Sequence, residues 1–145
     1  MLFIDEAYSL LPSGHGHDFA AEALSELIVQ METARHDLAV VLAGYPAEID
    51  ELIRSNPGIA SRLAYRLHFA DFTRDELLDI ARREMERRQY QYDHATITAI
   101  RSRIIRVGNK LPGNARDIRT WVEQAIHRAA VARRANVLAP EDFAA

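Results

Sequence analysis

Residues 2–8 read Leu2-Phe3-Ile4-Asp5-Glu6-Ala7-Tyr8, a short continuous apolar run that stops at two acids. A run of this kind predicts the end of a strand that is buried on both faces of a parallel sheet. Open α/β sheets bind ligands at the carboxyl ends of such strands. There, one carboxylate can hold a hydrated Mg²⁺ and its neighbour can orient and deprotonate a water molecule. A strand that merely enters a solvated loop also fits this short stretch.

The residues that follow predict an α/β arrangement. The segment from Tyr8 to His17 contains Pro12, Gly14 and Gly16 and is expected to be a loop, with Asp18 as a helix N-cap. Apolar spacing and chain-breaking residues then predict a helix over 19–35, a strand over 38–43, a short helix over 46–53, a turn of helix through Ser61 and a third strand over 65–69.

After Asp71 the pattern predicts helices only. Thr73 and Glu76 form a capping box before a helix that runs to about Arg88. Asp93 caps a second helix that ends at Gly108, and a third helix follows Gly113-Asn114. The expected fold is therefore α/β plus all-α. We expect a partial parallel sheet in residues 1–72 and a helical unit in residues 73–145.

Composition excludes several classes of protein. The chain has 145 residues, 48% of them hydrophobic and 27% charged, which is typical of a folded domain. No apolar run is long enough to span a bilayer, so we expect no membrane insertion. The absence of cysteine excludes disulfides and is compatible with the cytoplasm, where we expect the protein. The net charge of −3 combines an acidic first half with a basic second half that contains Lys110, the only lysine.

Two later segments each present an arginine beside a turn. Ser55-Asn56-Pro57-Gly58-Ile59-Ala60-Ser61-Arg62 places Arg62 after a chain break, and a guanidinium is suited to stabilise a transferring phosphoryl group. Gly113-Asn114-Ala115-Arg116 opens a helix whose N–H groups and Arg116 could bind an anion together. In isolation, an arginine such as Arg62 is more often a surface ion-pair partner, and the second segment also fits a simple helix start.

Taken in order, these three features resemble the AAA+ family of ATPases over the whole chain. The resemblance implies a partial parallel sheet of the P-loop NTPase type in residues 1–72, followed by a helical AAA+ lid in residues 73–145. Residues 2–8 are similar to Walker B, Ser61-Arg62 to the arginine-finger segment and residues 113–116 to sensor 2 of the helical lid. Leu42-Ala43-Gly44-Tyr45 and Ser55–Gly58 resemble the group of the red-type Rubisco activase CbbX/CfxQ, stage V sporulation protein K and type VII secretion ATPases.

The resemblance implies a role for each of these residues. It implies ATP and Mg²⁺ as cofactors, with Asp5 at the metal, Glu6 as the catalytic base and Arg62 acting in trans on a neighbouring subunit's ATP. Arg116 would contact phosphate in cis, with Asn114 beside it. Tyr45 occupies the sensor 1 position, where the family usually has Asn or Thr. The implied assembly is a homo-oligomeric ring, expected to be a hexamer, that remodels a protein substrate.

One motif of the family is absent from these residues. A P-loop needs a glycine-rich turn that ends in Lys followed by Ser or Thr, whereas Lys110 is followed by Leu111. In AAA+ proteins this Walker A motif lies upstream of Walker B. We therefore expect the sequence to be the C-terminal part of a longer protein, which alone would bind ATP poorly. The alternative is a non-hydrolysing interaction module.

Two further kinds of site, a metal site and a nucleic-acid-binding surface, are not expected from the sequence. His15, His17 and Asp18 have side chains that can ligate a metal, but their glycine-rich setting favours a solvated loop. The arginines of the helical half could suggest a nucleic-acid binder. Because acids are interspersed among them, we expect a solvated face and no nucleic-acid binding.

Overall fold

The computed structural model describes residues 1–11, 19–108 and 111–144. The chain divides into two compact units, Met1–Phe69 and Ala70–Ala145, and each is described by itself. The first unit is a small α/β structure and the second is mainly helical, so the predicted fold class is confirmed. The predicted loop over 8–17, the expected cap at Asp18 and the histidines at 15 and 17 lie wholly or partly outside the described residues.

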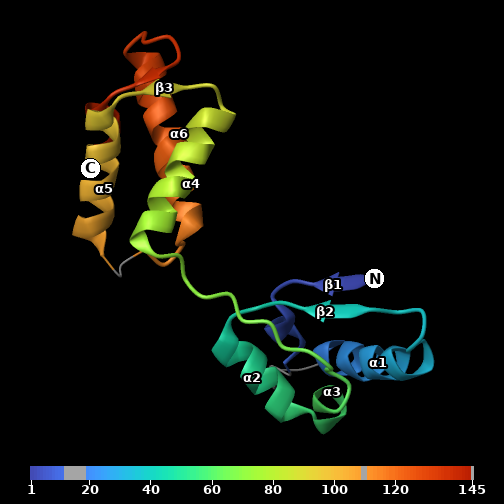
Figure 1. Ribbon diagram of the computed structural model, residues 1–145. Helices are drawn as coiled ribbons and strands as arrows, with labels where there is room; N and C mark the ends of the chain where they lie inside the picture. The colour runs from blue at the N-terminus through green and yellow to red at the C-terminus, as the bar shows by residue number, and fades with distance from the viewer. Residues whose placement is uncertain (12–18, 109–110, 145) are drawn as a thin grey trace. The chain divides into compact units, whose positions relative to one another are not determined.

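The first unit contains two parallel strands with helices on one side (Figure 1). Its elements are β1 (Leu2–Ile4), the 3₁₀ helix η1 (Ala7–Leu10), α1 (Phe19–Thr33), β2 (Val40–Leu42), α2 (Pro46–Ser55) and α3 (Pro57–Ala60). Part of the predicted loop is therefore the 3₁₀ helix η1, and the second strand is shorter than the predicted 38–43. The core that joins these elements includes Ala7, Leu24, Leu52 and Ile59.

The strands are not buried on both faces, contrary to the sequence prediction. Phe3 and Val41 are register partners and both are exposed, whereas the next pair, Ile4 and Leu42, packs against the core. Successive side chains of a strand point to opposite faces, and the helices described in this unit cover only one of them.

The predicted third strand over 65–69 is wrong. The structure has no strand there, and the side chains of Tyr65, Leu67 and Phe69 are each more than 80% exposed. A strand is defined by backbone hydrogen bonds to a neighbour, and among the described residues of this unit β1 and β2 pair only with each other. The apolar alternation of residues 65–69 therefore has no partner strand to pair with.

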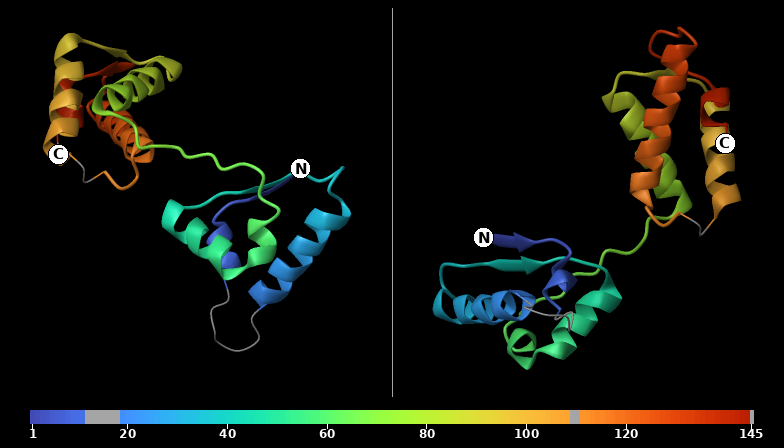
Figure 2. Two further views of the ribbon diagram at one scale, coloured as in Figure 1. Left: turned by 60° about the horizontal axis from the view of Figure 1, so that its bottom comes forward. Right: turned by 180° about the vertical axis from the view of Figure 1, so that it is seen from behind.

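The second unit packs three helices side by side (Figures 1 and 2). They are α4 (Arg74–Arg87), α5 (His94–Val107) and α6 (Ala115–Val131). The predicted caps are present: Thr73 and Glu76 form the capping box, and the Asp93 side chain accepts from the Thr96 N–H. The helices bury a common core of Leu77, Leu78, Ala81, Met85, Ile97, Ile100, Ile104, Ile118, Trp121, Val122, Ala125 and Ala129, together with Leu138 and Phe143.

The prediction of helices only after Asp71 missed a small parallel sheet. β3 (Gln91–Tyr92) pairs with β4 (Val137–Leu138), and the 3₁₀ helix η2 (Pro140–Phe143) then packs on α5 and α6. The fully buried Thr96 hydroxyl lies 3.2 Å from the Leu138 carbonyl oxygen, which links α5 to β4. Two-residue strands are too short to show a periodic pattern, so β3 and β4 could not be predicted from the apolar spacing.

Candidate functional site

The predicted metal ligand and base lie at the carboxyl end of β1. The Ala7 N–H donates to the Ala43 carbonyl oxygen at 2.9 Å, which holds the turn after β1 beside the end of β2. Asp5 and Glu6 are exposed, and one Asp5 oxygen accepts the Glu6 N–H at 3.0 Å. Glu6 has a left-handed backbone, with φ 51° and ψ 43°. The chain thus turns sharply where the two carboxylates are presented.

Asp5 is suited to a hydrated Mg²⁺. Its second carboxylate oxygen has no partner among the described residues and is open to solvent. Mg²⁺ in proteins keeps several waters and takes only one or two carboxylates, so an exposed carboxylate with one uncommitted oxygen fits it. Among residues 1–11, 19–108 and 111–144, no group of three His, Cys, Asp or Glu side chains is arranged to hold a metal by itself.

The aromatic side chain of Tyr8 lies beside the predicted base Glu6, and the sequence predicted no role for it. A Cβ at Gly44 would lie only 3.2 Å from the Tyr8 ring and 3.0 Å from Ile49, so the glycine allows the ring to approach β2 closely. Desolvation, and then the charge of Glu6 and a hydrogen bond with its carboxylate, raise the pKa of Tyr8. Tyr8 therefore remains a neutral phenol beside the predicted base.

Tyr45 lies at the same edge of the sheet as Asp5 and Glu6. It follows β2, precedes α2 and is exposed, and its side chain makes no capping hydrogen bond. The structure thus brings three of the predicted residues to the carboxyl ends of two adjacent strands.

Arg62 is held elsewhere in the same unit. Its Nη2 lies 3.1 Å from the Glu32 carboxylate, and its Nη1 donates to the Gly58 carbonyl oxygen at 2.9 Å. Glu32 is in the last turn of α1, from which the chain returns to the amino end of β2. The guanidinium is therefore tethered toward the edge of the sheet opposite to Asp5 and Glu6.

Arg66, the nearest other arginine along the chain, has a partner of its own. Its Nη1 lies 2.6 Å from the Asp50 carboxylate on α2. This hydrogen bond lowers the pKa of Asp50 and raises that of Arg66. Arg66 is thus paired with α2, whereas Arg62 is paired with α1.

The predicted sensor 2 segment opens α6 in the second unit. The Gly113 N–H donates to the Asp117 carboxylate at 2.9 Å, and a Cβ at Gly113 would come within 2.5 Å of that carboxylate. Asn114, with φ 48°, accepts the Phe72 N–H at 3.3 Å through its side chain. The Arg116 guanidinium is exposed and has no ion pair in the described part of the chain. The Asp117 carboxylate therefore already occupies part of the space at the start of α6.

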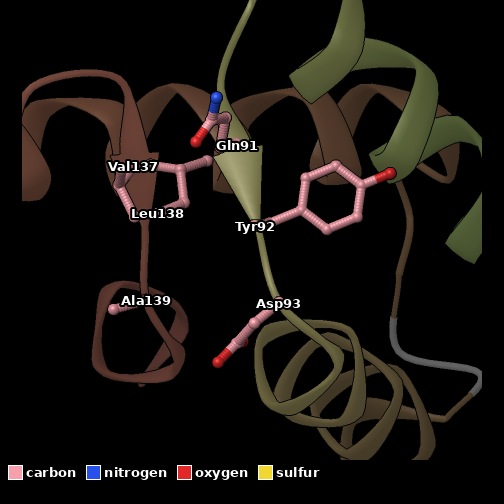
Figure 3. Close-up of a pocket in the computed structure, with 6 residues that line it drawn as sticks. All are labelled: Gln91, Tyr92, Asp93, Val137, Leu138 and Ala139. Atoms are coloured by element: carbon pink, nitrogen blue, oxygen red, sulfur yellow. The ribbon is translucent and has the colours of Figure 1, made fainter.

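A surface hollow of about 300 Å³ lies at the β3–β4 pair (Figure 3). It is lined by Gln91, Tyr92, Asp93, Val137, Leu138 and Ala139. The Asp93 carboxylate caps α5 there, and the Tyr92 hydroxyl donates to Glu86 at 2.8 Å. None of the predicted site residues lines this hollow, and its ionisable groups are already used to hold the fold.

Comparison with known protein families shows which family the chain belongs to. The AAA lid domain family matches residues 73–145, and the chain belongs to this family. The described helices include none long and apolar enough to cross a bilayer.

Individual relatives narrow the resemblance to one group. The chain is 38% identical over 126 residues to CbbX of Cereibacter sphaeroides, covering 86% of this chain and 41% of that protein. It is 33% identical over 135 residues to stage V sporulation protein K of Bacillus subtilis (strain 168), covering 90% and 42%. It is 44% identical over 91 residues to the chloroplastic ribulose bisphosphate carboxylase/oxygenase activase of Cyanidioschyzon merolae, covering 63% and 31%. The predicted CbbX/CfxQ-like AAA+ relationship is confirmed, and the chain spans less than half the length of these curated relatives.

Proposed function

We propose that these residues are the Walker B-to-lid part, residues 1–72 and 73–145, of an AAA+ ATP hydrolase that acts as a cytoplasmic homo-oligomeric ring, a hexamer, on a protein partner. The observation that carries the proposal is the position of Asp5 and Glu6 at the carboxyl end of a parallel strand beside β2. One relative is named an activase of ribulose bisphosphate carboxylase/oxygenase, which is a protein, and this supports a protein as the substrate.

In this proposal Asp5 binds the Mg²⁺ of ATP and Glu6 receives a proton from the attacking water. Both carboxylates are exposed on a turn that the Ala7–Ala43 hydrogen bond holds in place. Mg²⁺ supplies charge neutralisation of the phosphate oxygens when it is bound. Tyr45, at the end of the neighbouring strand, is the polar side chain that would face the same phosphates.

Arg62 is proposed to act on the ATP of a neighbouring subunit. Its ion pair with Glu32, in the last turn of α1, holds the guanidinium toward the edge of the sheet that is away from Glu6 of the same chain. A guanidinium at that edge is poorly placed to reach the ATP of its own subunit, and it is available to the ATP of a neighbouring subunit. Arg116, whose exposed guanidinium has no carboxylate partner among the described residues, is proposed to contact phosphate in cis beside Asn114.

Subunit mixing tests the proposal in the complete ring. Glu6→Gln is expected to bind ATP without hydrolysing it, and Arg62→Ala is expected to reduce turnover by about a thousandfold or more, as loss of an arginine finger does. In a mixed ring, an Arg62→Ala subunit still supplies Glu6 to its own site, and a Glu6→Gln neighbour supplies Arg62. Turnover that reappears on mixing the two inactive variants supports action in trans.

Arg66→Ala is the matched control, because it removes a nearby arginine whose partner is Asp50. It is expected to retain turnover. Unchanged turnover in Arg62→Ala, or loss only in Arg66→Ala, would reject the finger assignment. The non-hydrolysing module is the alternative: it predicts that no combination of subunits hydrolyses ATP and that Glu6→Gln traps none.

A further inference from the structure

Arg62 is held by a set of contacts within its own unit. The Asn56 side chain caps α3 by accepting the Gly58 N–H at 2.8 Å. A Cβ at Gly58 would lie 2.9 Å from that Asn56 oxygen and 3.3 Å from Ile28 on α1, so the glycine allows α3 to dock closely. This docking brings Arg62, which follows α3, to the last turn of α1.

The guanidinium is then fixed at both terminal nitrogens. Nη1 donates to the Gly58 carbonyl oxygen at 2.9 Å and approaches the Ser61 Oγ at 3.3 Å, and Nη2 meets the Glu32 carboxylate at 3.1 Å. A guanidinium has five N–H groups in one plane, so contacts at both ends fix that plane. One Nη2 hydrogen is left for a further acceptor.

We propose that Glu32 is a positioning residue for Arg62: it holds the guanidinium plane so that the remaining Nη2 hydrogen is presented to the phosphate of a neighbouring subunit's ATP. This inference rests on the proposed function. The carbonyl oxygen of Gly58 fixes only one end of the guanidinium, and without Glu32 the other end can rotate. Glu32 is itself 57% exposed, and an exposed ion pair of this kind contributes little to stability, so its role is separable from folding.

The first test uses this chain and needs no activity. Nitrogen-15 NMR of the arginine side chains follows the rate at which the Arg62 guanidinium rotates and exchanges its hydrogens, and the signal is identified by its loss in Arg62→Ala. The Arg62 guanidinium is expected to rotate and exchange faster in Glu32→Gln and to be unchanged in Glu22→Gln. Glu22 is an exposed acid on the same helix with no ion pair in the described part of the chain. Equal rates in wild type and Glu32→Gln overturn the inference.

The second test measures ATP hydrolysis in the complete ring. Glu32→Gln is expected to lower kcat about tenfold with KM for ATP unchanged, because a misplaced catalytic group affects the transition state more than binding. Glu32→Gln should add no further loss to Arg62→Ala, and Glu22→Gln should match wild type. If Arg62→Ala abolishes turnover while Glu32→Gln retains it fully, the positioning role is wrong and the proposed function stands. If Arg62→Ala retains turnover, the proposed function itself fails.

Discussion

The Glu84 carboxylate on α4 lies 3.4 Å from the Nε of Arg119 on α6, so a charged contact joins two helices of the lid. The same carboxylate accepts from Arg87 Nη2 at 2.8 Å and lies 3.6 Å from Arg88. Its side chain is 13% exposed. One partly buried acid therefore offsets three arginines that would otherwise repel one another.

Replacing Glu84 is expected to destabilise the lid. Glu84→Gln leaves three guanidiniums without this carboxylate and should lower the free energy of unfolding by about 1–2 kcal/mol. The fluorescence of Trp121, the only tryptophan, reports unfolding of the lid in urea. Glu123→Gln is the control, because Glu123 pairs with Arg88 at an exposed position and its loss should change little. Equal losses in the two variants would contradict the special role of Glu84.

Acid is expected to weaken the lid through its carboxylates. A hydrogen bond from Arg87, and then the charges of Arg87, Arg119 and Arg88, lower the pKa of Glu84; hydrogen bonds from Thr96 lower that of Asp93. A group whose folded-state pKa is lowered contributes stability above its unfolded pKa and loses it as the pH falls through the folded value. The urea midpoint of Trp121 fluorescence should therefore fall below about pH 4.5, and less steeply in Glu84→Gln. An unchanged slope in that variant would count against this assignment.

The close approach of Gly113 to Asp117 predicts a specific steric effect. Gly113→Ala places a methyl group 2.5 Å from the Asp117 carboxylate, which must then move and release the Gly113 N–H. We expect a loss of about 1–2 kcal/mol in lid stability. In the Asp117→Ala background the same substitution should cost much less, since the clash is gone. Additive losses in the double variant would show that the two residues are not coupled.

Replacing a core isoleucine of α5 by alanine should destabilise the lid far more than replacing a surface isoleucine of the same helix. Ile100 is 1% exposed and lies in the lid core, whereas Ile105 is 54% exposed. Ile100→Ala is expected to cost about 2–5 kcal/mol through lost burial and the cavity it leaves. Ile105→Ala should stay within about 0.5 kcal/mol of wild type. Urea unfolding followed at Trp121 measures both, and similar losses would contradict the packing of α5.

Hydrogen exchange should distinguish the two units of this chain. The amides of α4, α5 and α6 are expected to exchange most slowly, because those helices bury a shared core. The amides over 38–43 should exchange faster, since β2 has three residues and pairs only with β1 in the described sheet. Uniformly slow exchange in both units would show that the strands have found another partner.

The helices of the lid and the residues that cap them could be predicted from local sequence patterns. Thr73 with Glu76 and Asp93 with Thr96 lie three residues apart, and the hydrogen bonds they form are local, so their spacing in the sequence is enough to predict them. The apolar stripes of α4, α5 and α6 likewise follow the helical period and became the core. The apolar run Leu2-Phe3-Ile4 also predicted a strand, and β1 spans these residues, although its burial on both faces was predicted wrongly.

Contacts between residues far apart in the chain depend on how it folds and could not be predicted from the sequence pattern. The pairing of β3 with β4, the ion pair of Glu32 with Arg62 and the contact of Glu84 with Arg119 join segments that have no shared pattern in the sequence. Residues 65–69 show the converse: their alternation predicted a strand, yet the described part of the chain has no neighbouring strand to pair with them. Local hydrogen bonds and helical periodicity are properties of neighbouring residues, whereas strand pairing and ion pairs between elements depend on how the chain packs.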